Sequence, residues 1–279
     1  MTLLERYFRR LGIPAPAAGS DPVETLDNIL SHHAEAIPFE NLDPLLGRGA
    51  SLDPGVVATK LLDARRGGFC HEHALLVQQV LRELGFKCFP VLARVYRDPT
   101  LTTPSGPTHH LTLVVLGEQL RLVDPGFGGG TPTVSLPVEV GAQVGEFRLV
   151  SAPETLPSQL QARDVSLLLQ RRSGEGVWHN LYGFDTVPAQ PQDIEVSNWY
   201  VSTSPQVMFT RYPVLARPLR DGTRHSLRGR VLRSVGPEGE HREEIGDPGR
   251  LGQVLGEVFG LELIDAEVGE VWERSGEVD

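Results

Sequence analysis

The first third of the chain has a helical pattern of hydrophobic and polar positions. From residue 1 to about 85, apolar side chains recur every three or four residues, as on one face of an amphipathic helix. Loops with proline and glycine separate these stretches, and Ser20 or Asp21 before Pro22 is typical of a helix start. A helical bundle is predicted over residues 1–85, with apolar positions at Leu3, Leu4, Tyr7, Phe8, Leu11, Val23, Leu26, Ile29, Leu30, Val56, Leu61 and Leu62.

After Gly85 the pattern changes to short runs rich in β-branched residues, which are typical of strands. The clearest runs are CFPVLARVYR, HLTLVVL, LRLVDP, FRLV and VSLLLQRR. Gly117 and Glu118 join two alternating runs, which indicates a hairpin. Residues 86–198 are therefore expected to form an antiparallel sheet or barrel. In residues 199–279, RHSLRGRVLRSV predicts further strands and GRLGQVLGEVFGL predicts a helix.

The composition is that of a folded globular protein and narrows the classes of partner. The 279 residues are 40% hydrophobic and 22% charged, with a formal net charge of -10. Nucleic acid or an anionic membrane is not expected as the main partner, because phosphate groups are bound mostly by Lys and Arg. The N-terminus carries Glu5, Arg6, Arg9 and Arg10 where a signal peptide needs apolar residues, so we expect a cytoplasmic protein.

The two cysteines, Cys70 and Cys88, are expected to be free thiols, because an intracellular chain of this length needs no disulfide. Cys70 follows Gly67 and Gly68 and precedes a segment with an apolar helical face. Glycines allow a sharp turn and close approach to a ligand. A thiol in the first turn of a helix has a lowered pKa, which favours the nucleophilic thiolate. Burial of Cys70 as a small apolar side chain is the alternative.

A nucleophilic thiol needs a base and a group that orients the base. His110 lies at the head of one predicted strand, and Asp124 lies at the end of the strand that returns beside it. A carboxylate that holds one ring nitrogen leaves the other nitrogen to face the thiol. We therefore predict that Cys70, His110 and Asp124 act together as catalytic residues.

Five segments together resemble the arylamine N-acetyltransferases. RGGFCHE (66–72) matches the family's RGG-aromatic-Cys-x-Glu signature, HLTLVV from His110 matches its histidine strand, and DPGFG (124–128) matches Asp-x-Gly-Phe-Gly. IPFENL and NWYVSTSPQVMF agree as well. The resemblance implies an α+β fold with an N-terminal helical bundle, a central antiparallel β-barrel and a C-terminal α/β lid around a papain-like Cys-His-Asp core.

The resemblance also implies an acyltransferase with a ping-pong mechanism. Cys70 takes the acetyl group from acetyl-CoA, and an arylamine, hydrazine or N-hydroxyarylamine then attacks the thioester. Acetyl-CoA is a co-substrate in this scheme, and no metal or prosthetic group is required. The residues that the resemblance assigns to coenzyme A are Gly126, Gly128, Ser105 and Gly106. Those that it places at the acyl and arylamine pocket are Phe127 and Phe209. His109, directly before the predicted catalytic histidine, is expected to narrow or polarise the acceptor pocket.

Departures from the family pattern are His71 in place of an apolar or aromatic residue, Ala74 in place of Asn, and Pro125 in place of Val. None belongs to the predicted triad, so activity is expected. Outside the triad, Glu40 and Asn41 are expected to brace the junction between regions. Glu72 is expected to pair with Arg66 or with buried backbone.

Other functions remain open at this point. A metal site is not expected, because the histidines near Cys70 lack the H-E-x-x-H spacing and no second cysteine pair exists. A thiol hydrolase or transglutaminase-like enzyme shares the triad, and a non-catalytic binding protein would have an unreactive Cys70. An amide synthase of the same fold, acting on polyketide thioesters, is a further alternative. The preferred amine, the acyl donor and the oligomeric state stay open.

Overall fold

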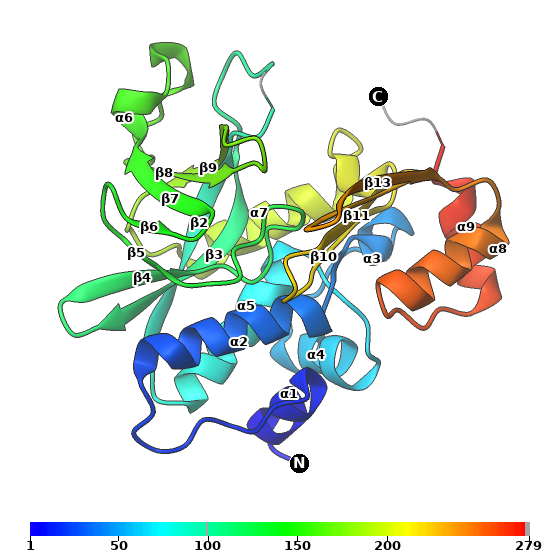
Figure 1. The fold of residues 1–279 in the computed structure, drawn as a ribbon, viewed down its shortest axis with the longest axis horizontal. Helices are drawn as coiled ribbons and strands as arrows, with labels where there is room; N and C mark the ends of the chain where they lie inside the picture. The colour runs from blue at the N-terminus through cyan, green and yellow to red at the C-terminus, as the bar shows by residue number, and fades with distance from the viewer. Residues whose placement is uncertain (99, 277–279) are drawn as a thin grey trace.

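The computed structural model describes residues 1–98 and 100–276 (Figure 1). Its N-terminal part is helical, as predicted, and no helix among the described residues is long and apolar enough to cross a membrane. The helices are α1 (Leu3–Leu11), α2 (Pro22–Ala36), α3 (Leu42–Leu45), α4 (Pro54–Ala58), the π-helical turn Thr59–Asp63, and α5 (Cys70–Glu83). Their apolar faces share one core that includes Tyr7, Phe8, Leu26, Ile29, Leu30, Leu61, Val77 and Val80.

Local sequence signals set the starts of the first two helices. Thr2 accepts a hydrogen bond from the Glu5 amide at 3.2 Å, and the Glu5 carboxylate accepts one from the Thr2 amide at 2.8 Å. At α2, the predicted cap Asp21 precedes Pro22 and accepts the amide of Glu24 at 2.8 Å.

Eight antiparallel strands form the central sheet, in the order β5-β4-β3-β2-β9-β8-β7-β6, and curve into a nearly closed barrel (Figure 1). The strands are β2 (Lys87–Val95), β3 (Pro107–Leu116), β4 (Gln119–Val123), β5 (Leu136–Pro137), β6 (Gln143–Val144), β7 (Phe147–Ser151), β8 (Leu167–Arg172) and β9 (Trp178–Phe184). Alternate residues fill the interior, among them Val91, Ala93, Leu111, Leu113, Leu122, Phe147, Leu149, Leu169 and Tyr182. The predicted antiparallel barrel is confirmed.

A five-stranded antiparallel sheet lies on the other side of the molecule, in the order β1-β10-β11-β12-β13. Its strands are β1 (Phe39–Glu40), β10 (Val214–Pro218), β11 (Arg224–Arg228), β12 (Val231–Gly236) and β13 (Gly239–Glu244). The helices α8 (Pro248–Gln253) and α9 (Asp265–Glu273) pack against it through a shared apolar cluster (Figure 1). The expected boundary between residues 198 and 199 falls inside helix α7 (Pro191–Thr203).

Asn41 joins the N-terminal region to this second sheet. Its fully buried amide donates to the carbonyl oxygens of Phe209, at 2.8 Å, and Tyr212, at 2.9 Å. Its side-chain oxygen accepts the amide of Val214 at 2.7 Å. Since β1 also pairs with β10, the expected bracing role of Asn41 is confirmed.

Asn41→Ala should therefore lower the free energy of unfolding by about 2–4 kcal/mol, because it leaves buried backbone groups without partners. Urea unfolding followed by circular dichroism measures this change. Asn28→Ala, at an exposed position of α2, is the matched control and should change stability by less than about 0.5 kcal/mol. Equal stability of the two variants would contradict the bracing role.

Candidate active site

Cys70 is the first residue of helix α5 and is 5% exposed. The Glu72 carboxylate accepts the backbone amide of Phe69, the N-cap residue, at 3.1 Å. This interaction satisfies one of the free amides at the helix start. The predicted position of Cys70 in the first turn of a helix is confirmed, and so is the pairing of Glu72 with buried backbone.

The two glycines before Cys70 are required for close packing. The Gly68 carbonyl accepts the amide of Glu40 in β1 at 2.8 Å. A side chain on Gly67 would collide with the Pro38 carbonyl, and a Cβ on Gly68 would lie 2.9 Å from Glu72 Oε2. Arg65, with φ of 51°, adopts the left-handed conformation just before them. The glycines therefore bring the loop against β1 and α5.

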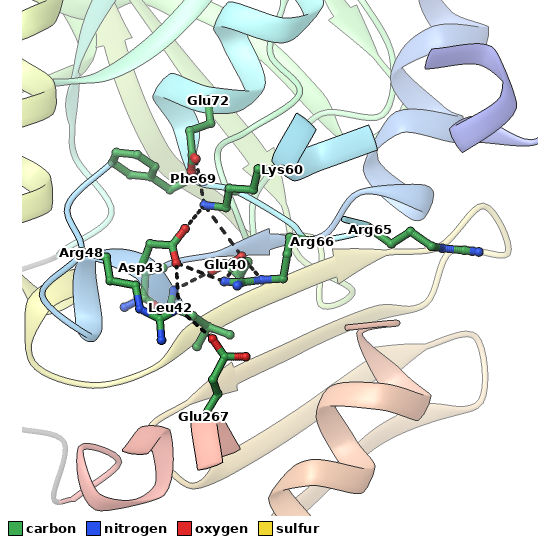
Figure 2. A network of polar contacts seen from close by, with 12 residues as sticks. Glu40, Leu42, Asp43, Arg48, Lys60, Arg65, Arg66, Phe69, Glu72 and Glu267 are labelled. Atoms are coloured by element: carbon green, nitrogen blue, oxygen red, sulfur yellow. Dashed lines mark hydrogen bonds and ion pairs between the residues drawn. The ribbon is translucent and has the colours of Figure 1, made fainter. Parts of the chain in front are cut away.

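A network of buried charged side chains lies against the same loop, residues 66–69 (Figure 2). Lys60 Nζ lies 2.8 Å from Glu72 Oε1 and 2.7 Å from Asp43 Oδ2, and Arg66 Nη2 lies 2.8 Å from Glu40 Oε1. Burial lowers the pKa of Lys60, but the charges of Glu40, Glu72 and Asp43 outweigh burial and raise it. Lys60 is therefore charged, and it is the cation that pairs with Glu72.

The structure pairs Asp124 with His109 and not with the predicted His110. His109 Nε2 lies 2.9 Å from Asp124 Oδ2, and both side chains are buried. His110 points to the opposite face of β3, where its Nε2 lies 3.0 Å from the Gln78 amide of α5. Burial and the neighbouring charge of His109 lower the pKa of His110 to about 3, so His110 is neutral.

The hairpin register explains this correction. Successive side chains of a strand point to opposite faces, and directly opposite residues share a face. Thr112 lies opposite Val123, so one step further Leu111 lies opposite Asp124. His109 shares the face of Leu111, whereas His110 does not. The Gly117–Glu118 turn fixes this register, and counting back from it would have identified His109 from the sequence.

His109 connects Asp124 to Cys70. Burial lowers the pKa of His109, but the charge and hydrogen bond of Asp124, with a hydrogen bond to Cys70, raise it to about 9. Since Asp124 occupies Nε2, Nδ1 is the ring nitrogen left to face the sulfur. The site therefore holds an imidazolium between a carboxylate and a thiol, which is the arrangement that keeps a cysteine ionised.

The two predicted pocket phenylalanines lie beside this triad. The Phe127 ring centroid lies 4.8 Å from the His109 ring. Phe209 belongs to the apolar cluster that contains Cys70, with its ring 5.7 Å from Phe39 and 6.4 Å from Phe69. His109, which was expected to polarise the pocket, is instead the imidazole that contacts Asp124.

Three of the residues that the resemblance assigns to coenzyme A are in contact with other parts of the protein. The Gly126 amide donates to Asp124 Oδ1 at 3.1 Å, and a Cβ there would lie 2.8 Å from His73 Cβ, so Gly126 packs the loop onto α5. Gly128 has φ of 77° and faces Phe39. The Ser105 hydroxyl donates to the Val95 carbonyl at 3.0 Å.

Gly106 lines a groove of about 760 Å³ between the barrel and helix α7. Thr108 and Ser197 also line this groove and lie close to the nucleophile. The Thr108 carbonyl oxygen lies 3.9 Å from Cys70 Sγ, and Ser197 contacts His71. The groove therefore lies next to the nucleophile, although Cys70 itself does not line it.

Comparison with known proteins agrees with this geometry. A family model described as N-acetyltransferase matches residues 22–268. A curated arylamine N-acetyltransferase of Mycolicibacterium smegmatis is 37% identical over 98% of this chain and 96% of its own length. The chain belongs to the arylamine N-acetyltransferase family.

Solved structures of the family have the same fold. The Salmonella typhimurium arylamine N-acetyltransferase superposes with a TM-score of 0.86, at 32% identity, over 98% of each chain. The Mycobacterium marinum enzyme in complex with CoA gives a TM-score of 0.83, at 33% identity, over 98% of each chain. The expected α+β architecture is confirmed.

Two residues near the triad had no signal in the sequence. The Tyr182 ring of β9 lies 4.8 Å from His109, and burial with the nearby Asp124 charge raises the pKa of Tyr182, so it stays protonated. Arg97 lies over the Phe127 ring, with its guanidinium carbon 5.8 Å from the ring centroid. In residues 1–98 and 100–276, no three His, Cys, Asp or Glu side chains converge as metal ligands do.

His109→Gln should slow alkylation of Cys70 by iodoacetamide at pH 7 by about a hundredfold or more, because the thiol loses its base. His110→Gln is the matched control, since it alters the neighbouring histidine on the opposite face of β3. It should react within about twofold of the wild-type rate if His110 is not the base. Mass spectrometry of the modified cysteine gives both rates, and the reverse order would restore the original assignment to His110.

Proposed function

We propose that this protein transfers acetyl groups from acetyl-CoA to arylamines, hydrazines or N-hydroxyarylamines through a thioester at Cys70. The observation that carries the proposal is the buried pair of His109 and Asp124, in which Nε2 lies 2.9 Å from Oδ2 and the pKa of His109 is raised by Asp124 and by Cys70. Family membership and the CoA complex of the Mycobacterium marinum relative support acetyl-CoA as the donor.

In the first half-reaction, the Cys70 thiolate attacks the carbonyl carbon of acetyl-CoA. The bond between that carbon and the coenzyme sulfur breaks, and the protonated His109 gives its proton to the departing thiolate. Asp124 holds the imidazole in place and stabilises its positive charge throughout. His109 is then neutral and Cys70 carries the acetyl group.

In the second half-reaction, the amine nitrogen attacks the thioester carbon. Neutral His109 accepts the amine proton, as general base catalysis requires, and the Cys70 sulfur leaves with the bonding electron pair. Arylamines suit this step because they are weak bases and therefore mostly unprotonated and nucleophilic at neutral pH. The apolar rings of Phe127 and Phe209 beside Cys70 suit an aromatic acceptor.

We assign the phosphates of the coenzyme to Arg97. Arg97 lies beside the DPGFGGG loop, where a Cβ on Gly129 would be 3.9 Å from its Nη1. Burial and the neighbouring cations Arg171 and Arg228 lower the pKa of Arg97, which indicates a local excess of positive charge. In a chain with a net charge of -10, this cluster suits a pyrophosphate or a ribose phosphate.

We also propose that the protein acts in the cytoplasm, because its chemistry needs a reduced thiol at Cys70 and the cytoplasm keeps thiols reduced.

Brief exposure to acetyl-CoA should place one acetyl group on Cys70, as seen in the intact-protein mass, and an arylamine should remove it. Cys70→Ala should show no adduct. Cys88→Ser is the control and should behave as wild type, because Cys88 lies in β2 beyond the triad. An adduct that persists in Cys70→Ala would refute the proposal, and an adduct lost to water as fast as to amine would favour a hydrolase.

Arg97→Ala should raise the KM for acetyl-CoA about tenfold, the loss expected for one charge-assisted hydrogen bond, with kcat unchanged. The rate with p-nitrophenyl acetate, a donor without phosphates, should not change. Arg82→Ala removes an equal charge from the far end of α5 and serves as the control. If both donors are affected alike, Arg97 does not bind the phosphates.

A further inference from the structure

His71 is a second imidazole at the nucleophile that the triad does not use. Its Nδ1 lies 3.3 Å from Cys70 Sγ, and its Nε2 lies 3.1 Å from the Ser197 hydroxyl of α7. His71 is fully buried, and Ser197 is 6% exposed. The sulfur therefore contacts an imidazole of its own helix, besides the His109 imidazole whose pKa it helps to raise.

The surroundings of His71 oppose a positive charge on it. Its ring lies 5.3 Å from the His110 ring and 5.4 Å from the Phe69 ring. Burial is the main cause that lowers the pKa of His71 well below its ordinary value, and the neighbouring His110 and His109 imidazoles lower it further. The charged and titratable groups that face it are thus Cys70, His109 and His110, and among these His109 carries the proton. His71 is neutral, with one N–H donor and one acceptor nitrogen.

The protonation states of Cys70 and His71 then decide which atom donates and which accepts in each hydrogen bond of His71. A thiolate has no proton to donate, so His71 Nδ1 must carry the hydrogen that points at the sulfur. Nε2 is left as an acceptor and takes the hydroxyl proton of Ser197. By donating to Nε2, Ser197 stabilises the tautomer in which Nδ1 is the donor.

We propose that His71 donates a hydrogen bond to the Cys70 sulfur, in a tautomer stabilised by Ser197. The effect on the resting thiolate rests on the ionised Cys70 that the His109–Asp124 pair favours, whereas its effect on turnover also rests on the proposed function. A donor at the sulfur stabilises the thiolate and keeps it ionised to lower pH. Through its contacts with Ser197 and Cys70, His71 also links helix α7, at the edge of the groove, to the nucleophile.

The same donor acts when the acetyl group leaves. As the amine attacks the thioester carbon, the C–S bond breaks and its electron pair moves to the sulfur, while the amine proton goes to His109. His71 keeps its own proton and stabilises the charge that develops on sulfur. The acetylated sulfur is a weak acceptor, so this hydrogen bond strengthens only as the bond breaks.

The test is the pH profile of Cys70 alkylation by iodoacetamide, in a Cys88→Ser background so that a single thiol reacts. His71→Phe keeps a flat ring but removes the donor, and should raise the midpoint of the profile by about one pH unit. His71→Asn retains an N–H donor and should stay near the parent value. His179→Phe, at an exposed position of β9, is the matched control and should not shift the midpoint.

Ser197→Ala should raise the midpoint by a smaller amount, since it frees the tautomer without removing the ring. An unchanged midpoint in both His71→Phe and Ser197→Ala overturns the proposal. A lower midpoint in His71→Phe also overturns it, because His71 would then accept a proton from a neutral thiol. If His71→Phe fails to fold, Ser197→Ala decides alone.

Deacylation provides a separate measurement. The acetyl-enzyme of His71→Phe should lose its acetyl group to an arylamine several-fold more slowly than wild type, because the leaving sulfur lacks a donor. If wild type forms no acetyl-enzyme, the proposed function fails, whereas the alkylation profile still tests His71. A shifted profile with unchanged deacylation would limit His71 to the resting thiolate and overturn its role in the leaving step.

Discussion

The structure around the nucleophile depends on the close packing of one loop, residues 66–69, between strand β1 and the start of helix α5. Backbone hydrogen bonds join this loop to Glu40 and Pro38, and the absence of side chains at Gly67 and Gly68 allows the approach. Charged groups that would be costly to bury alone are paired beneath it (Figure 2). Because β1 is also the edge strand of the second sheet, the same segment fixes both the nucleophile and the region that covers it.

A chain of buried hydrogen bonds supports the loop from the helical side. Tyr7 contacts His33 at 2.9 Å, His33 contacts His73 at 2.7 Å, and His73 Nε2 lies 2.9 Å from the Gly68 carbonyl. A carbonyl only accepts, so His73 must donate to Gly68, accept from His33, and leave His33 to accept from Tyr7. Burial lowers the pKa of His33, and that of His73 to about 4, so both are neutral. The hydrogen bonds of this series therefore all run in one direction, from the Tyr7 hydroxyl to the Gly68 carbonyl.

The five buried histidines show how one residue type takes different roles. His109 is charged because a buried carboxylate outweighs its burial. The other four lack such a partner, and burial keeps them neutral, so they donate and accept as fixed dipoles. Placing a single charge among neutral rings avoids repulsion around the sulfur and concentrates proton transfer on His109.

The sequence by itself determined the order of helices and strands, the helix start at Cys70, the hairpin before Asp124 and the family, because periodicity, turn residues and motifs are local signals. It also contained the hairpin register that identifies His109, although adjacent histidines make a one-residue error easy. Only the tertiary structure decided which groups meet across distant segments. The contact of His71 with Ser197, the position of Arg97 by the glycine loop and the pairing of β1 with β10 join residues far apart in the chain. Such contacts depend on how whole elements pack, and no local pattern encodes that packing.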